Sequence, residues 1–253
     1  MYKRCDNGYS EGVTAGPEAT STRRERVRAA TQAEIKQRAW AQIARGGADA
    51  LSLRSLARDM GMTGSAIYRY YAGRDELLLA LMQDAFASLA DALEAAEVDS
   101  LEAGQGGTDE HWMVIARAYR NWARGHPSEY GLIFGKRLNL DHEAGPVGPE
   151  HRRGVAVLFR AMVGCVASGR VDLSALDASV SPELRRQLEG WKAAEGIDLP
   201  IAALAGCMTC WSQLHGMLML ELFGGFPPQL VPLDALFDQQ MRYLMVRMGV
   251  RTG

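Results

Sequence analysis

The residues that could support catalysis or metal binding are few and poorly arranged for either task. Cys207 and Cys210 have the spacing of a redox pair, but their stretch is uncharged and no strand precedes it, so two small buried residues on one helix face explain them better. His215 is a poor third zinc ligand, because positions five and eight residues away on a helix do not converge on one tetrahedral ion. An Asp-His-Glu triplet at 141–143 could bind a metal, although solvated loop charge is commoner. The sequence predicts no enzyme, cofactor or metal site.

A different chemistry, the reading of DNA, is predicted by residues 51–71. Leu56 and Ala57 would pack inward on one helix, and Gly61 supplies the positive φ that a tight turn needs. The hydroxyl of Thr63 would then cap a second helix. This is the build of a helix-turn-helix, although small residues and a glycine turn also occur in helical hairpins that bind no DNA.

The outward face of that second helix would carry the base-reading side chains. Ile67 is expected to point into the small core of the motif. The opposite face, where an inserted helix would meet base edges, is then formed by Gly64, Ser65, Tyr68 and Arg69. Arginine suits both bidentate recognition of guanine and binding of phosphate.

Charge is distributed unevenly along the 253 residues, whose net charge is -2. Between Arg23 and Arg74 there are eleven basic residues against four acidic ones, and from Asp75 onward fifteen against twenty-three. This asymmetry fits a basic N-terminal part that meets phosphate, with a charged, solvated helix face as the alternative. The composition, 47% hydrophobic and 23% charged, is that of a globular protein and excludes a largely disordered or fibrous chain.

We expect an all-α protein, because apolar residues recur at helical spacing and strand alternation is absent. The expected helices span about 27–46, 51–60, 63–71, 74–97, 111–124, 127–134, 150–168, 201–223 and 233–248, with a short one beginning at Ser181 in an otherwise irregular stretch from 172 to 199. The expected organisation is a flexible leader at 1–22, a three-helix DNA-binding domain at 23–73, and a larger ligand-binding and dimerisation domain at 74–253, connected by the helix 74–97.

No residue between Asp198 and Glu221 is charged, which raises the question of a membrane span. The stretch contains small polar residues and lacks flanking basic ones, so a helix buried in a protein interface explains it better. Four cysteines make no disulfide framework, and the first residues contain no apolar stretch of signal-peptide type. We therefore expect a cytoplasmic protein with no membrane partner.

Residues 28–82 resemble the N-terminal domain of the TetR-type transcriptional repressors. The matching positions are Ile35, Ala39, Leu56, Ala57, Gly61, Met62, Thr63, Ile67, Tyr68 and the run from Tyr71 to Leu77. Three positions depart from the family pattern. Arg74 stands where a lysine is usual, Gly73 where a capping Ser or Asn is common, and Ala66 where a hydroxyl is often found.

The expected DNA contacts are Arg54, Thr63, Gly64, Ser65, Tyr68, Arg69, Tyr70 and Arg74. The resemblance implies that Ser65 and Arg69 read bases, with Arg54 reaching in from the preceding helix. Tyr70 and Arg74 are expected to hold phosphate at the far end of the recognition helix.

The larger part of the chain resembles the C-terminal domain of a TetR subgroup named for its Trp-His-Gly motif, through the runs 119–130 and 211–224. The residues expected to line a ligand pocket are Tyr119, Trp122, Phe134, Phe159, Met162, Trp211 and His215. Such a pocket would favour a mostly apolar, aromatic or planar molecule, oriented by polar contacts from His215 or Tyr119. A packed core without a cavity is the alternative.

A dimer interface is expected on the last two long helices, since small residues let a neighbouring helix approach closely. The residues expected there are Ala205, Thr209, Ser212, Gly216, Phe237, Met241 and Leu244. If both helices pair with copies of themselves, they form a four-helix interface, as the resemblance also implies. A wholly intramolecular core is the alternative.

Together these features predict a homodimeric repressor that leaves a palindromic operator when a small, mostly apolar ligand binds. One alternative is a helical enzyme or small-molecule-binding protein whose basic head is incidental. Another is a constitutive DNA-binding protein with no ligand. Release of DNA by a ligand would separate the last alternative from the main prediction.

Overall fold

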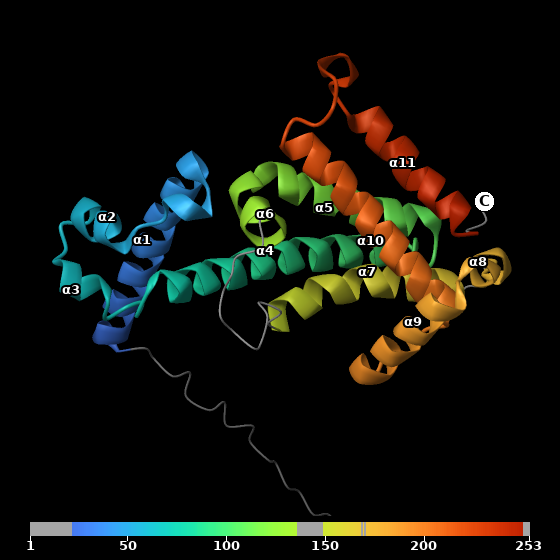
Figure 1. The fold of residues 1–253 in the computed structure, drawn as a ribbon, viewed down its shortest axis with the longest axis horizontal. Coiled ribbons are helices and arrows are strands. Elements are labelled where there is room, and N and C mark those ends of the chain that lie inside the picture. Colours follow the sequence, from blue (N-terminus) through green and yellow to red (C-terminus); the bar gives the residue numbers. More distant parts are fainter. Residues whose placement is uncertain (1–21, 136–148, 168, 170, 250–253) are drawn as a thin grey trace, which may run out of the picture.

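The computed structural model describes residues 22–135, 149–167, 169 and 171–249 (Figure 1). Its elements in chain order are α1 (Arg23–Gly46), η1 (Ala48–Ala50), α2 (Leu53–Asp59), α3 (Gly64–Ile67), α4 (Arg74–Glu102), α5 (Asp109–Gly125), α6 (Pro127–Phe134), α7 (Pro149–Ala167), α8 (Ser174–Ser179), α9 (Pro182–Glu195), α10 (Ile201–Leu222), η2 (Pro228–Leu230) and α11 (Asp234–Arg247). The all-α prediction is confirmed for these ranges. The leader predicted at 1–22 lies outside them except for its last residue.

The first three α-helices surround a small apolar core of their own, to which we refer as the head core (Figure 1). Ile35 of α1, Leu56 of α2 and Ile67 of α3 are fully buried in it. α1 begins with a capping box, in which the Thr22 hydroxyl accepts from the backbone N–H of Glu25 and the Glu25 carboxylate accepts from that of Thr22. The start of the head is therefore defined by local hydrogen bonds as well as by burial.

α4 runs from the head into a larger helical body (Figure 1). Leu78, near its start, lies in the head core, whereas Leu93 lies in the core of the body. The helix continues to Glu102, past its expected end near residue 97. Glu97 is buried and pairs with Arg160 of α7, which keeps the last turns of α4 packed against the body.

The body consists of the far half of α4 with α5, α7, α10 and α11 packed around a second core. α7 lies along α4, and α10 and α11 cross α5 (Figure 1). The largest fully buried side chains of this core include Met113, Ile115, Tyr119, Tyr130 and Phe237. Their burial removes a large apolar area from water, which is the main stabilising contribution to such a core.

The stretch from 172 to 199 is more regular than its sequence suggests, because it forms both α8 and the 14-residue α9. Ser181 caps α9 by accepting from the backbone N–H of Leu184, and Gly196 ends the helix in the left-handed region at φ 63°. Leu188 is the buried residue of α9. With so little of the helix buried, its apolar periodicity is faint, and this explains why the sequence indicates only a short helix.

The uncharged helix predicted near 201–223 is α10, one side of which is buried in the body. Leu204, Leu214 and Leu218 are fully buried against the other helices of the body. Within the described ranges, no helix is both long and apolar enough to cross a membrane.

Candidate DNA-binding surface and ligand cavity

The segment from α2 to α3 has the geometry expected of a helix-turn-helix. Ala57 and Ile67 are buried, and Gly61 adopts the predicted positive φ, 64°. The outward face is exposed as predicted at Gly64, Ser65, Tyr68 and Arg69. α3 itself is shorter than expected, since its regular helix ends at Ile67 and residues 68–70 continue as turns.

Thr63 does not cap α3 in the way the sequence predicts. It occupies the N-cap position, but its side chain accepts no hydrogen bond from the backbone of the helix. Its Oγ1 lies 3.3 Å from the hydroxyl oxygen of Ser65, so the two hydroxyls pair with each other. The backbone carbonyl of Thr63 still accepts from Ala66 N–H at 2.9 Å, which closes the first turn.

Arg28 of α1 holds the end of the recognition segment, a role that the sequence analysis missed. Its Nη2 donates to the backbone carbonyl of Arg69 at 3.1 Å, and its guanidinium lies 5.2 Å from the ring centroid of Tyr70. The first contact joins residues 41 positions apart, so helical periodicity gives no signal of it. Arg28 thereby fixes the backbone from which Arg69 projects.

Arg74 is tied to the head rather than extended into solvent. Its Nη2 donates to the backbone carbonyl of Ala48 at 2.8 Å and lies 3.8 Å from an Asp49 carboxylate oxygen. Gly73 provides no side-chain cap for α4, as its departure from the family pattern implies. Instead, the Glu76 carboxylate accepts from the backbone N–H of Ala72 just ahead of the helix. Contact of Arg74 with phosphate stays a prediction.

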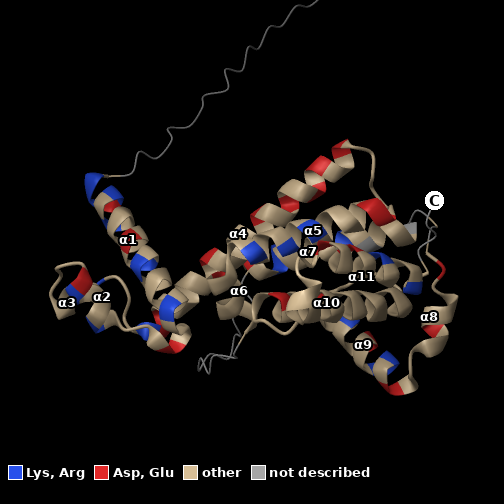
Figure 2. Ribbon diagram, turned by 90° about the horizontal axis from the view of Figure 1, so that it is seen from above, with Lys and Arg blue, Asp and Glu red and all other residues tan. Residues whose placement is uncertain are grey.

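Basic residues gather along α1, whereas acidic residues gather along the far half of α4 (Figure 2). Some of these basic side chains form ion pairs within the chain, since Lys36 pairs with Asp84 at 2.7 Å and Arg38 with Glu34 at 2.8 Å. The side chain of Arg69 forms no ion pair or hydrogen bond with the described residues. It is therefore available to a nucleic acid.

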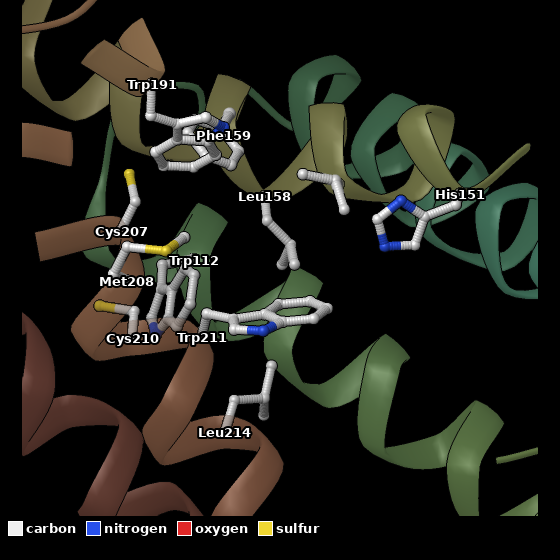
Figure 3. A pocket seen from close by; sticks show the side chains of 11 residues that line it. Trp112, His151, Leu158, Phe159, Trp191, Cys207, Met208, Cys210, Trp211 and Leu214 are labelled. Atoms are coloured by element: carbon white, nitrogen blue, oxygen red, sulfur yellow. The ribbon is translucent and has the colours of Figure 1, made fainter. Parts of the chain in front are cut away.

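An apolar cavity of about 200 Å³ lies in the body between α5, α7, α9 and α10 (Figure 3). Its wall consists of Trp112, His151, Val155, Leu158, Phe159, Trp191, Cys207, Met208, Cys210, Trp211 and Leu214. Among these lining residues there is no Asp, Glu, Lys or Arg. A wall of this kind favours an uncharged, largely apolar occupant.

His215 is held between two tyrosines and is not part of that wall. Its Nε2 lies 3.0 Å from the hydroxyl oxygen of Tyr119, and its Nδ1 lies 2.9 Å from that of Tyr130. Because a neutral imidazole has one donor and one acceptor nitrogen, one tyrosine donates to the ring and the other accepts from it. Burial, assisted by nearby His151, lowers the pKa of His215 to about 4, so the ring is neutral at pH 7.

The predicted ligand contacts do not all meet at one cavity. Phe159 and Trp211 line the 200 Å³ cavity. Tyr119 and Phe134, together with Trp211, border a separate space of about 10 Å³. That space is at most the size of one water molecule, so it cannot hold an organic ligand.

Trp122 and Met162 are the remaining predicted contacts. Trp122 lines neither the 200 Å³ cavity nor the 10 Å³ space. Its indole N–H donates to the Ser88 hydroxyl at 3.0 Å, and its ring stacks on His126. Met162 belongs to α7, but its side chain lies outside the described part of the protein.

Trp112 and His151 line the cavity although the sequence analysis did not select them. Trp112 stands seven residues before Tyr119 on α5, and two helical turns place both on one face, so the spacing carried a usable signal. His151 lies in the first turn of α7 and has no comparable partner in the sequence.

The expected dimer residues divide between surface and core. Phe237, Met241 and Leu244 of α11 are buried in the core of the body, which favours the alternative of an intramolecular core for them, and their part in a dimer interface stays a prediction. Their apolar spacing reflects packing against α5 and α10 within one chain. The small residues predicted on α10 lie at or near its surface, namely Ala205, Thr209, Ser212 and Gly216.

Cys207 and Cys210 are buried free cysteines, as the structural interpretation of their spacing predicts. Burial raises the pKa of each thiol to about 12, which leaves both protonated and weakly nucleophilic at neutral pH. In the described ranges, no cluster of His, Cys, Asp or Glu is arranged to hold a metal ion. The triplet at 141–143 lies outside those ranges.

An exposed recognition face on a helix-turn-helix, joined by a long helix to an α-helical body, defines a DNA-binding transcription regulator. Residues 35–81 match the family described as bacterial regulatory proteins of the tetR family. Residues 112–244 match the tetracyclin repressor-like C-terminal domain. The chain belongs to the TetR family of transcriptional regulators, and it is a regulator rather than an enzyme.

Relatives and solved structures agree with this assignment. The helix-turn-helix transcriptional regulator Rv1816 of Mycobacterium tuberculosis is 30% identical over 230 residues, which cover 88% of this chain and 94% of that protein. The crystal structure of a regulatory protein designated SCO4313 is 34% identical, with a TM-score of 0.71 over 89% of this chain and all of that one. A protein of unknown function from Rhodococcus shares the fold at 20% identity, with a TM-score of 0.64 over 92% of this chain and 98% of that one.

Proposed function

We propose that this regulator is a repressor that binds a palindromic operator as a homodimer and leaves it when a small, mostly apolar ligand enters the body. In this proposal residues 23–73 act as the DNA-reading head and residues 74–253 as the ligand-binding and dimerisation part. The observation that carries it is the 200 Å³ apolar cavity, because Trp211 in its wall packs against a helix that reaches the head core. The assignment of the body to the Trp-His-Gly subgroup and an activity in the cytoplasm belong to the same proposal.

The path from cavity to head runs through α6. Trp211 lines the cavity, and its ring centroid lies 5.9 Å from that of Phe134 on α6. Leu132, two residues earlier on α6, is buried in the head core together with Ile35 of α1. A ligand that displaces Trp211 would therefore disturb a helix whose other side supports the head.

The head has room to respond to such a disturbance. A cleft of about 620 Å³ separates the end of α1 and η1 from α6 and the end of α10. Two heads of a dimer must reach successive major grooves about 34–36 Å apart. A ligand that fits better when the heads are at another separation lowers operator affinity by its difference in affinity for the two arrangements.

The proposed dimer surface combines the exposed sides of α10 and α11. The side-chain amide of Gln213 on α10 lies 3.5 Å from that of Gln240 on α11, so the two exposed faces adjoin. On α10 this face includes Gly216, and on α11 Tyr243 and Val246 are 51% and 58% exposed. In this proposal the α11 contacts with the partner copy come from these exposed side chains and not from the buried Phe237, Met241 and Leu244.

Selection of DNA from a random pool by the purified protein tests the proposed operator. A dimer with two equivalent heads should enrich an inverted repeat whose half-site centres are one helical turn apart or a multiple of it. Enrichment of a single, asymmetric half-site would contradict the dimeric arrangement. A protein whose affinity for the enriched site is unchanged by every cavity ligand would instead be a constitutive DNA-binding protein.

A further inference from the structure

α1 begins well before the segment that matches the tetR family. The helix spans Arg23–Gly46, whereas the match begins at residue 35. Residues 23–34, to which we refer as the α1 extension, make up about three helical turns ahead of that match. The capping box formed by Thr22 defines the start of these turns, so the extension is a regular helix from its first residue.

The start of the α1 extension is strongly basic. Four of its first six residues are arginines, namely Arg23, Arg24, Arg26 and Arg28. Like charges three or four residues apart on a helix repel each other, so this arrangement is unfavourable without a negative partner. Glu25 is the one acidic residue among the six, and its carboxylate accepts from the backbone N–H of Thr22.

Most of these arginines have no partner in the protein. The side chains of Arg23, Arg24 and Arg26 are exposed and form no hydrogen bond or ion pair with the described residues. Further along α1, Lys36 and Arg38 are paired with acidic side chains. Among the described residues, the basic side chains of α1 that lack a protein partner therefore all lie in the extension.

One face of the α1 extension lies against the end of the recognition segment. Arg28 donates to the backbone carbonyl of Arg69 at 3.1 Å, and its guanidinium lies 5.2 Å from the ring centroid of Tyr70. Ile35, two turns later on the same face, is fully buried in the head core. Arg24 stands one turn before Arg28 and about three turns before Ile35, so it occupies the same face, one turn beyond the last of these contacts.

This position places Arg24 beside the path of a bound DNA backbone. A recognition helix meets base edges inside the major groove, and the phosphates that border the groove lie next to its end. In Figure 2 the start of α1, which is blue because of its arginines, extends past α2 and α3. An arginine in this position lies outside the groove, where phosphate is the group that it meets. Phosphate is also the negative partner that Arg24 lacks within the protein.

We propose that the α1 extension is a second DNA-contacting surface of the head, on which Arg24 binds a backbone phosphate next to the half-site read by α3. Contacts of this kind fix the position of a protein on the duplex without reading its sequence. Arg28 joins the extension to the recognition segment, so the two DNA contacts move as one unit. The inference rests on the proposed function for the operator on which it is measured.

Arg24→Ala tests the contact and should leave the fold intact, because the side chain is exposed and alanine is the best helix former. Fluorescence anisotropy at a series of salt concentrations gives the affinity for the selected operator and for a random duplex. Loss of one phosphate contact should reduce the slope of log affinity against log salt by about 0.9 per head, or about 1.8 for a dimer with both heads bound. Both duplexes should lose affinity by a similar factor. An unchanged slope would overturn the proposal.

Arg26→Ala is the matched control within the same extension. Because Arg26 is two residues from Arg28, it lies on the opposite side of the helix, where it faces away from the recognition segment. Arg45→Ala removes the same charge from the other end of α1. Both controls should keep the salt slope of the unmodified protein. Equal reductions in Arg24→Ala and Arg26→Ala would show that the general charge of the extension, and not a contact of Arg24, attracts DNA.

Neutral methylphosphonate linkages identify the phosphate. In a set of operator duplexes, each carries one such linkage at a different position bordering a half-site. One replacement should weaken binding of the unmodified protein by about twofold to fivefold, the effect of losing an exposed ion pair. The same replacement should leave Arg24→Ala unaffected, because that variant has already lost the contact. If every replacement weakens the two proteins equally, Arg24 binds none of these phosphates and the proposal fails.

The selection experiment distinguishes this inference from the proposed function. If the unmodified protein selects an inverted repeat and Arg24→Ala binds it with unchanged affinity and salt slope, the proposed operator stands and the second surface is refuted. If the selected site is a single half-site and Arg24→Ala loses about 0.9 of the slope, the phosphate contact holds and the dimeric arrangement fails.

Discussion

Arg28 and Arg69 illustrate how two arginines in one basic segment can have different functions. The Arg28 guanidinium donates to the backbone carbonyl of Arg69 and lies over the ring of Tyr70. The Arg69 side chain is exposed and forms no hydrogen bond or ion pair with the described residues. The first residue positions the recognition segment, and the second is expected to contact DNA.

Replacing Arg69 with alanine should weaken binding to the selected operator by about 1–3 kcal/mol and relax the preference at one base pair, as for other arginines that read guanine. Fluorescence anisotropy with operator and random duplexes measures both effects. Arg186→Ala is the control, because it removes an exposed positive charge from α9, far along the chain from the head. An equal loss on operator and random DNA would make Arg69 a phosphate contact only.

Protonation of His215 should destabilise the fold in acid. The ring faces Tyr119, Tyr130 and His151, and its pKa of about 4 lies below the ordinary value near 6.5. Between those values the unfolded chain binds the extra proton, so stability falls as the pH drops from about 6.5 toward 4, by at most about 1.4 kcal/mol per pH unit from this group.

Urea unfolding at pH 7, 6 and 5 measures that slope, and His215→Gln should flatten it. His111 and His151, whose pKa values burial also lowers, remain in the variant and leave a residual slope. Identical slopes in the two proteins would show that His215 does not titrate in this window.

At the scale of elements, helices with local stop and start signals could be predicted from the sequence, whereas those shaped by distant contacts could not. α6 has the predicted bounds because Pro127 begins it and Gly135 follows its end. α4 extends past its predicted end near residue 97, because Glu97 pairs with Arg160 of α7, a helix much later in the chain. Of the predicted ligand residues, Phe159 and Trp211 line the cavity, and the rest of its wall could not be predicted because it forms only where α5, α7, α9 and α10 meet.

Gly216 offers a clean test of the proposed dimer surface. An added Cβ would meet no heavy atom within 4 Å, so Gly216→Leu should leave the folded monomer intact. Leucine is also a better helix former than glycine by up to about 1 kcal/mol. If α10 pairs with its copy at this point, the larger side chain should split or distort the dimer and weaken operator binding.

Gly190→Leu is the matched control, because Gly190 lies on α9 and is equally open to solvent. Sedimentation velocity gives the oligomeric state of both variants. A Gly216→Leu protein that sediments like the control and binds the operator equally well would place Gly216 outside the interface.

In the whole molecule, two apolar cores are joined by α4 and α6, and charge divides along the same line. The body is braced by buried Arg120 of α5, which pairs with Glu221 of α10 at 2.8 Å and with Asp234 of α11 at 3.0 Å. In the proposed mechanism, a body held in this way passes a local change at the cavity on to α6, because close packing leaves little room to absorb it. The basic head can lie on DNA while the acidic body is kept away from it.

The central claim is that the cavity and the DNA-reading head are coupled, and thermodynamic reciprocity tests it most directly. Naphthalene, a neutral apolar probe of a size suited to the 200 Å³ cavity, is titrated into the protein alone and into the protein saturated with its selected operator, and operator affinity is measured with and without saturating naphthalene. The account predicts that each ligand weakens the other by the same factor, between about 5 and 150 for typical couplings. Equal naphthalene affinity in the free and the operator-bound protein would contradict it.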